Sequence, residues 1–217
     1  MKVAIIGATG FVGRPILAEA LAHDGLSVTG IVRNIDALPR HDRLTAKSCD
    51  VRDTQALAEV LRGHDAVIHA YHPGRQGVGI YHQTAAGHHS IIAAVKIAGI
   101  PRLLGVGGAA SLKTPEGVEY IDSPRWDKAF DPNREAILGT RALYYILKDE
   151  KELDWVVLAP SVMLRPGERT NKFRYGKNDL LLDAAGNSRI SLEDYALAMI
   201  QELLHPGHHR ERFTVGY

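Results

Sequence analysis

The chain has little cysteine, no long hydrophobic run and no marked excess of either charge. Cys49 is the only cysteine among 217 residues, which excludes an intramolecular disulfide and a zinc site built on cysteines, and is typical of a reducing compartment. No apolar run approaches the roughly eighteen residues of a membrane-spanning helix, and a strand predicted from residue 2 leaves no room for a signal peptide. The formal net charge is +1, so net charge gives no attraction to nucleic acid or a membrane. We therefore expect a cytoplasmic protein without nucleic-acid or membrane partners.

Short apolar runs alternate with helix-like segments along most of the chain. Hydrophobic residues make up 45% of the sequence, which is enough to fill a sizeable core. Strands are predicted over residues 2–6, 27–32, 44–48, 66–69, 102–106 and 155–159, and helices over residues 11–22, 54–61, 81–98 and 132–148. This alternation predicts an α/β fold, a doubly wound parallel sheet with helices on both faces.

After Pro160 the alternation weakens. We expect a loop over residues 165–171, a small hairpin from 172–175 and 180–182, and a short strand at 188–190. Ser191 is placed to cap a helix that runs to residue 204, and residues 212–216 are expected to form a last edge strand. Because no repeat or composition break divides the chain, we predict one domain over residues 1–217, with residues 160–217 as a C-terminal elaboration on the substrate side.

Three glycines follow the first predicted strand at intervals of three residues. Gly7 permits a tight exit from the strand, Gly10 lets backbone N–H groups approach a pyrophosphate, and Gly13 allows close packing of the next helix on the strand. The pyrophosphate would also lie at the positive end of that helix dipole. A strand, this glycine pattern and a helix in succession predict a dinucleotide-binding site. A structural turn is the alternative, but it would need only one or two of these glycines.

The second predicted strand is followed by Arg33, twenty residues after Gly13. In dinucleotide-binding folds the adenosine ribose lies at this point: an acid accepts bonds from the 2′-hydroxyl, whereas a guanidinium pairs with a 2′-phosphate. Arg33 therefore favours NADP(H). Asp36 is the rival residue, since it would serve as the ribose acid and favour NAD. A solvated surface arginine is the simpler alternative for Arg33.

Two more strand ends face the same edge of the predicted sheet. Asp50, at the end of the third strand, can accept a bond from the exocyclic amine of adenine, with Val51 against the ring. The alternative is an acid in the turn before the next helix. The segment after the fourth strand should run beneath the cofactor ribose; it comprises His69, Ala70, Tyr71 and His72.

Several segments, taken in order, support a family comparison. They are residues 7–13 with the three glycines, residues 102–112 with a Gly-Gly-Ala-Ala-Ser turn, residues 154–160, and the C-terminal stretches 166–170, 190–196 and 212–217. Together they resemble the atypical short-chain dehydrogenase/reductases, especially the NAD(P)H-binding group of NmrA-like and biliverdin-reductase-B-like flavin reductases. The likeness covers nearly the whole chain, although Ala110 stands where the group has glycine.

The resemblance implies a Rossmann sheet of order 3-2-1-4-5-6-7, NADP(H) in an extended groove and a small C-terminal lid. It implies that the pyrophosphate turn comprises Gly7, Thr9, Gly10, Phe11 and Val12. Arg33 would take the 2′-phosphate, and Asp50 and Val51 the adenine. The central ribose would contact His69, Ala70 and Tyr71, and the nicotinamide would lie near Pro160, Ser161 and Val162.

The catalytic residues of full short-chain enzymes are only partly present. Those enzymes use a serine and a Tyr-x-x-x-Lys pair in which lysine lowers the pKa of the tyrosine. Ser111 stands where the serine is expected and is our candidate for orienting the acceptor, with a structural turn serine as the alternative. Tyr144 and Lys148 match the string, but they fall near the end of their helix. A working pair belongs near residues 133–137, where the sequence has no tyrosine.

A missing tyrosine favours acceptors that need little help from a protein proton donor. A flavin or quinone must mainly be stacked near the nicotinamide, whereas an aldehyde or ketone develops alkoxide charge that needs a donor. Candidate walls of the acceptor pocket are Tyr71, His72, Tyr120 and Trp126. Of the eleven histidines, His69 and His72 lie near the predicted site, but no carboxylate at ligand spacing accompanies them, so we expect no metal.

We therefore expect an NADPH-dependent oxidoreductase that reduces a small conjugated or aromatic acceptor. The alternative is a non-catalytic, NADP-binding redox-sensing regulator of the NmrA type. A sugar-nucleotide epimerase-like enzyme is disfavoured by the absent tyrosine and the short C-terminal part. The sequence leaves open whether the protein is a monomer or a dimer.

Overall fold

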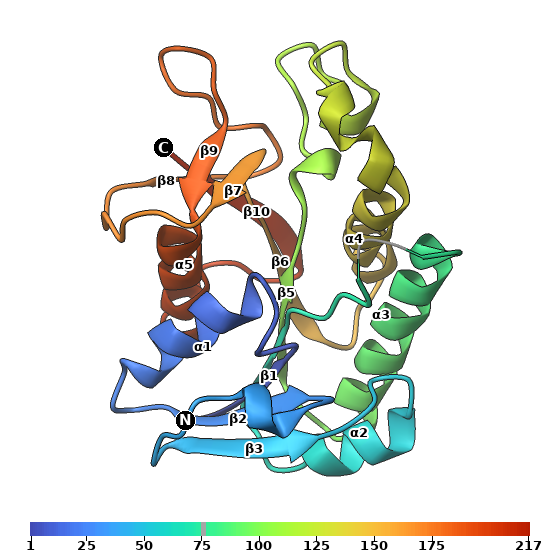
Figure 1. Ribbon diagram of the computed structural model, residues 1–217, viewed down its shortest axis with the longest axis vertical. Coiled ribbons are helices and arrows are strands. Elements are labelled where there is room, and N and C mark those ends of the chain that lie inside the picture. Colours follow the sequence, from blue (N-terminus) through green and yellow to red (C-terminus); the bar gives the residue numbers. More distant parts are fainter. Residues whose placement is uncertain (75–76) are drawn as a thin grey trace.

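The predicted apolar runs form the strands of one twisted sheet (Figure 1). The computed structural model describes residues 1–74 and 77–217. Seven parallel strands lie in the order β3-β2-β1-β4-β5-β6-β10, which confirms the predicted order. Their bounds are β1 Lys2–Ile6, β2 Ser27–Val32, β3 Leu44–Ser48, β4 Ala66–His69, β5 Arg102–Val106, β6 Asp154–Ala159 and β10 Glu211–Gly216.

Helices cover both faces of the sheet, as the alternation predicted. On one face α1 (Gly13–Leu21) packs against α5 (Leu192–Leu204). The other face carries α2 (Thr54–Leu61), α3 (Ile80–Ile97) and α4 (Arg134–Leu147), which Figure 1 shows side by side. In the part of the chain that the structure describes, no helix is long and apolar enough to cross a membrane.

Local signals set the helix ends. Asp53 caps α2 by accepting a bond from the Ala56 N–H at 3.0 Å, and Ser191 caps α5 by accepting one from the Asp194 N–H at 3.0 Å. Gly63 and Gly99 follow α2 and α3 with φ of 77° and 69°, the left-handed conformation that glycine adopts without strain. The helix predicted from residue 132 begins at Arg134, because residues Lys128–Asn133 form a tighter 3₁₀ segment, η4.

The C-terminal part differs from the expectation in three respects. No hairpin joins residues 172–175 to 180–182: β8 (Arg174–Gly176) instead pairs antiparallel with β10. Residues 178–180 find their backbone partner in Lys113, whose N–H donates to the Asn178 carbonyl and whose carbonyl accepts from Leu180 N–H, both at 2.8 Å. Since β8 covers it, β10 is not the edge strand that the sequence predicted.

A second small sheet also forms above the C-terminal half of the main one. Strand β7 (Met163–Arg165) pairs in parallel with β9 (Arg189–Ser191). The strand at 188–190 was predicted within one residue, whereas β7 was not. β7 is only three residues long, which is too short for a recognisable alternation of apolar and polar residues in the sequence.

Candidate functional site

The glycine turn lies between the ends of three strands. Gly7 follows β1 with φ of 81°, and its N–H donates to the Ile31 carbonyl of β2 at 2.9 Å. On the other side, a Cβ on Gly7 would lie 2.6 Å from the Ala70 carbonyl oxygen after β4. The turn therefore has a fixed place at the carboxyl edge of the sheet, where ligands bind in open α/β folds.

Close packing of α1 on the turn leaves no room for a side chain at Gly13. A Cβ there would lie 2.0 Å from the Gly7 carbonyl oxygen, and the Gly10 N–H donates to that same oxygen at 2.9 Å. Among the described residues, no side chain caps the start of α1 at Val12. The Arg14 and Ile16 N–H groups donate to the Gly10 and Val12 carbonyls at 3.0 and 3.3 Å, so the cradle that fits a pyrophosphate consists of the turn and the helix N-terminus at residues 11–13.

The exposure of the turn residues is compatible with pyrophosphate binding. Thr9 and Val12 are partly exposed, and Gly10 is exposed. Phe11 is 51% exposed, which is unusual for a large apolar ring. These residues lie at the surface of the turn rather than in the core.

Charged residues gather where β2 and β3 end. Cys49 N–H donates to the Val32 carbonyl at 3.1 Å, and Ser48 Oγ donates to the Arg33 carbonyl at 3.1 Å, so the two strand ends are neighbours. Arg33 and Asp50 are both exposed there. Asp36, the rival residue, is also exposed, and its N–H donates to Asn34 Oδ1 at 3.0 Å in the short turn after Arg33.

Arg52 is a member of this group that sequence reasoning missed. Its guanidinium donates to both carboxylate oxygens of Asp50, at 2.7 and 3.2 Å, and its backbone N–H donates to Asp50 Oδ1 at 3.0 Å. These bonds lower the pKa of Asp50 to about 2. Val51 is 8% exposed and packs in the core beneath this end of the sheet.

A buried chain of hydrogen bonds follows β4. The Tyr71 N–H donates to His69 Nδ1 at 3.3 Å, His69 Nε2 lies 2.8 Å from His88 Nδ1, and His88 Nε2 lies 3.1 Å from the Gly139 carbonyl of α4. An N–H at one end and a carbonyl at the other fix both imidazoles as neutral Nε2–H tautomers. Burial, and then the neighbouring His88, lower the pKa of His69 well below its usual range, and burial lowers that of His88 to about 4.

This chain places the segment that was expected to line the ribose. His69 is only 1% exposed, and its ring points to His88 of α3, so it supports the neighbouring backbone rather than offering a side chain to a ligand. Ala70 N–H donates to the Ile6 carbonyl at 2.9 Å, which holds Ala70 against the glycine turn. The half-buried Tyr71 ring packs on Gly87, where a Cβ would lie 2.2 Å from Tyr71 Cε1, and burial raises the pKa of Tyr71.

Ser111 lies in the short 3₁₀ segment η2 (Ala109–Ser111) after β5. It is 2% exposed, and its Oγ donates to the Gly108 carbonyl at 3.3 Å. Arg212 Nη1 donates to the Ser111 carbonyl at 2.7 Å. The α4 side chain beside this turn is Thr140, whose methyl carbon would lie 3.3 Å from a Cβ on Gly108. To donate a hydrogen bond to a bound acceptor, Ser111 Oγ must give up its bond to the Gly108 carbonyl.

Tyr144 and Lys148 lie at the C-terminal end of α4. The Arg212 guanidinium stands over the Tyr144 ring, 4.1 Å from its centroid. Lys148 is the C-cap residue and stands over the neighbouring Tyr145 ring at 5.1 Å. The Tyr144 ring and the Lys148 ammonium group thus each contact another side chain at this end of α4.

The remaining candidates lie on the C-terminal side of the sheet. Pro160 and Ser161 are buried, and Ser161 Oγ donates to the Val215 carbonyl at 3.0 Å. Val162 is partly exposed, and its N–H donates to Ser188 Oγ at 3.2 Å. These bonds tie the exit of β6 to its neighbours, so a ligand would meet fixed backbone there.

The expected acceptor walls come from two regions. His72 is partly exposed, and its Nδ1 accepts from the Gly74 N–H at 3.1 Å. Tyr120 is 6% exposed and packs on Trp126 with ring centroids 5.3 Å apart, which leaves little of Tyr120 for contact with a guest. Trp126 is partly exposed, with Nε1 donating to Asp131 Oδ1 at 2.7 Å and the Arg134 guanidinium 5.4 Å from its ring. Trp126 is thus the more accessible wall.

Part of the loop predicted over residues 165–171 is held on two sides. Arg169 makes two hydrogen bonds with the Glu19 carboxylate of α1, at 2.7 and 3.0 Å. Thr170 Oγ1 and the Tyr217 hydroxyl both donate to Asp194 Oδ2, which lies in the first turn of α5. These contacts hold residues 169–170 beside the helix that follows the glycine turn.

The clustered histidines before the last strand lie at the opposite edge of the sheet. His208 Nδ1 is 2.8 Å from Glu202 Oε2, and His209 Nδ1 is 3.0 Å from Asp154 Oδ1 at the start of β6. Arg102 Nη2 also donates to Glu202 at 2.6 Å. Within residues 1–74 and 77–217, no group of three or more histidine, cysteine, aspartate or glutamate side chains is arranged to hold a metal.

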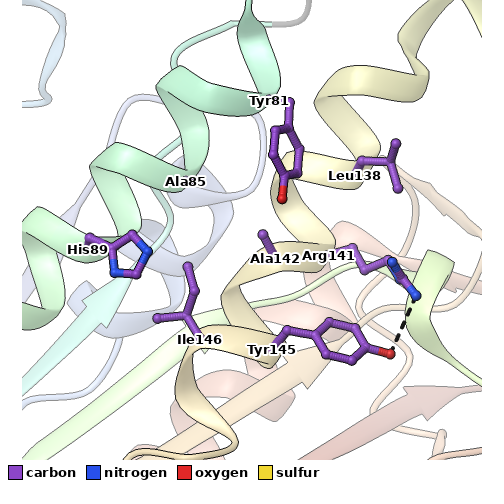
Figure 2. Close-up of a pocket in the computed structure, with 8 residues that line it drawn as sticks. All are labelled: Tyr81, Ala85, His89, Leu138, Arg141, Ala142, Tyr145 and Ile146. Carbon is purple, nitrogen blue, oxygen red and sulfur yellow. Dashed lines mark hydrogen bonds between the residues drawn. The ribbon is translucent and has the colours of Figure 1, made fainter.

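A cavity of about 430 Å³ lies away from the glycine turn, between α3 and α4. Figure 2 shows its lining residues, which come from these two helices: Tyr81, Ala85, His89, Leu138, Arg141, Ala142, Tyr145 and Ile146. None of the residues predicted for the cofactor or acceptor is among them, so this cavity is separate from the predicted dinucleotide site.

Comparison with known proteins agrees with this geometry. The sequence matches the NAD(P)H-binding family over residues 7–206. It is 36% identical over 223 residues to the uncharacterized Bacillus subtilis protein YwnB, across 99% of this chain and 98% of that protein. A proposed epimerase from Bacteroides thetaiotaomicron is 43% identical, with a TM-score of 0.91 over 100% of this chain and 96% of that one. A Streptococcus pneumoniae protein proposed to be an NADH-flavin reductase is 27% identical, with a TM-score of 0.85 over 100% and 99% of the two chains.

Proposed function

The chain belongs to the NAD(P)H-binding family of atypical short-chain dehydrogenase/reductases, and from this premise we propose that it is an NADPH-dependent reductase of a small conjugated acceptor, a flavin or a quinone. The observation that carries the proposal is the cradle at residues 7–13. A Cβ at Gly13 would lie 2.0 Å from the Gly7 carbonyl oxygen, so only glycine lets α1 begin this close to the strand. The resulting backbone fits a pyrophosphate.

The preference for the phosphorylated coenzyme rests on Arg33. It is exposed at the end of β2, where the adenosine ribose of a dinucleotide lies in this fold. A guanidinium can form two charge-assisted bonds with a phosphate and gives little help to a neutral 2′-hydroxyl. Asp36 lies in the 3₁₀ turn beyond it (η1, Ile35–Ala37), where its backbone N–H bonds to Asn34.

The proposed class of acceptor depends on the side chains beside the turn after β5, where a serine and a threonine stand rather than a tyrosine. Thr140 is the α4 side chain nearest to Gly108, and the hydroxyl of the nearby Ser111 is bonded to the Gly108 carbonyl. When bound, NADPH supplies a hydride. The protein's own part is to hold a planar acceptor in contact, because proximity and orientation carry much of such a reaction. Trp126 is partly exposed on this side, and an acceptor that stacks on its ring would displace the Arg134 guanidinium, which lies 5.4 Å from the ring centroid.

The neighbour proposed to be an NADH-flavin reductase supports this choice of acceptor. The test is NADPH oxidation in the presence of FMN, a panel of quinones, and simple aldehydes and ketones. We expect steady turnover with flavin or quinone and far less with isolated carbonyl compounds. Tight NADPH binding without turnover on any acceptor would overturn the proposal and favour a redox-sensing regulator.

A further inference from the structure

Arg52 is a charged side chain at the adenosine end of the proposed site. It is 71% exposed, yet its guanidinium is held in one orientation by both carboxylate oxygens of Asp50. The backbone N–H of Arg52 also donates to Asp50 Oδ1 at 3.0 Å, which fixes the turn between the two residues. A long side chain that would otherwise sample many rotamers is thereby directed to one place.

Arg33 lies close to the same carboxylate. β2 and β3 are paired up to Val32 and Ser48; Arg33 follows Val32 directly, and Asp50 stands two residues beyond Ser48. The charge of Arg33 contributes, after that of Arg52, to the low pKa of Asp50. Both arginines also act electrostatically on the Tyr71 hydroxyl, where they oppose the rise that burial causes in its pKa. Asp50 and Tyr71 thus lie within the field of two guanidinium groups.

We propose that Arg52 is a second ligand of the cofactor's 2′-phosphate, acting with Arg33, and that Asp50 positions its guanidinium. The inference rests on the proposed function, because it presumes NADPH in the groove. It deepens that function by adding a residue that determines the choice between NADPH and NADH. A guanidinium whose fork is partly engaged by a carboxylate keeps N–H groups for a second anion.

A phosphate suits this position better than the adenine ring or an unmodified ribose. The Arg33–Asp50–Arg52 group contains two cations and one carboxylate, so these three side chains together carry one net positive charge. The Asp53 carboxylate is turned away, since its Oδ1 accepts from the Ala56 N–H of α2. A dianionic 2′-phosphate would balance this charge, whereas a neutral 2′-hydroxyl would leave it in place.

Arg62 provides a matched control. It also forms an exposed, local ion pair, with Glu59 at 3.0 Å, and it lies at the C-terminal end of α2, away from the strand ends. Loss of a surface ion pair as such would be the same in Arg52→Ala and Arg62→Ala. Any difference between the two variants in nucleotide binding therefore reports on the place of Arg52.

The experiment measures the dissociation constants of NADPH, NADH, adenosine 2′,5′-bisphosphate and AMP by calorimetry. We expect Arg52→Ala to weaken the two ligands with a 2′-phosphate by about tenfold and to leave NADH and AMP nearly unchanged. Arg52→Lys should lie between, because it keeps the charge and loses the fork. Arg62→Ala should bind all four ligands as the wild type does. Equal weakening of all four ligands, or no change in any, would overturn the proposal.

A second pair of variants separates direct contact from neutralisation of Asp50. Removing Arg52 also exposes the carboxylate, which could repel the phosphate by itself. In an Asp50→Asn background, direct contact predicts that Arg52→Ala still weakens adenosine 2′,5′-bisphosphate. Loss of the effect in that background would overturn direct contact. Failure of the proposed function looks different, since the wild-type protein itself would then bind neither NADPH nor NADH.

Discussion

His69 Nε2 lies 2.8 Å from His88 Nδ1, and this buried pair joins the exit of β4 to α3 and, through the Gly139 carbonyl, to α4. His88 is 2% exposed, and His69 is 1% exposed. Because Tyr71 N–H donates to the other nitrogen of His69, the pair also fixes the backbone that faces the glycine turn. The geometry of the site thus depends on two side chains that no ligand touches.

Replacement of His88 should destabilise the protein more than replacement of its neighbour His89. His88→Phe leaves the buried His69 Nε2–H without a partner, which costs about 1–3 kcal/mol, and removes the side-chain donor to the Gly139 carbonyl, which stays paired within α4. His89 is exposed on the same helix, so His89→Phe should change little. Denaturant unfolding of the two variants measures the difference, and equal stabilities would contradict the role of the pair.

The pair should also make the protein less stable in mild acid. Its pKa values are lowered in the folded state, that of His88 to about 4 from 6.5. As the pH falls below 6.5, the two histidines become protonated in the unfolded chain but stay neutral in the folded chain. The free energy of unfolding therefore decreases between about pH 6.5 and 4. Each histidine contributes a slope of about 1.4 kcal/mol per pH unit. Unfolding measured at several pH values should show a shallower slope in His88→Phe than in the wild type; identical slopes would contradict this.

Gly13→Ala should disturb both folding and cofactor binding. The new Cβ would lie 2.0 Å from the Gly7 carbonyl oxygen, so α1 must shift away from the turn, at a cost of at least about 1–3 kcal/mol. A Cβ on Gly25 would meet nothing within 4 Å. Gly25→Ala is therefore the control and should keep the wild-type melting temperature and affinity for NADPH. A Gly13→Ala protein that matched this control would show that the turn is not tightly packed.

Arg33→Ala should weaken NADPH and leave NADH nearly unchanged. The guanidinium can bond to a 2′-phosphate through two charge-assisted bonds, so the loss should reach about tenfold in the dissociation constant. Competitive titration with the two coenzymes gives the ratio directly. Equal effects on both would remove Arg33 from its assigned role.

Tyr144→Phe should leave turnover intact. The Tyr144 ring packs beneath the Arg212 guanidinium at the C-terminal end of α4, and Lys148 is the C-cap of that helix. Steady-state kinetics with NADPH and the best acceptor measure the effect, which should stay within about twofold in kcat. A hundredfold loss would show that Tyr144 donates a proton after all.

Much of the sheet could be predicted from the sequence because most of its strands are buried apolar runs; β3, whose residues are mostly exposed, is the exception. Strands β1 to β5 and helix α2 have the predicted bounds, and the capping residue Ser191 gave the start of α5. The glycine turn could be predicted equally well, because close backbone packing at Gly7 and Gly13 excludes other residue types. These features depend on local pattern.

The features that were missed depend on contacts between distant residues. Strand β8 is three residues long and exists because β10 offers it an edge, while residues 178–180 pair with Lys113. The His69–His88 bond needs the register between β4 and α3, and both histidines appear in the sequence as ordinary members of their elements. Arg52 had a local signal, a cation two residues after Asp50, but only the structure shows that it turns back onto that carboxylate.

The central claim is that residues 7–13 hold the pyrophosphate of a phosphorylated nicotinamide coenzyme. A crystal structure of the wild-type protein grown with NADP⁺ tests it most directly. The account predicts the pyrophosphate on the backbone N–H groups between Gly7 and Gly13 and the 2′-phosphate beside Arg33. Coenzyme bound elsewhere, or none at saturating concentration, would contradict it.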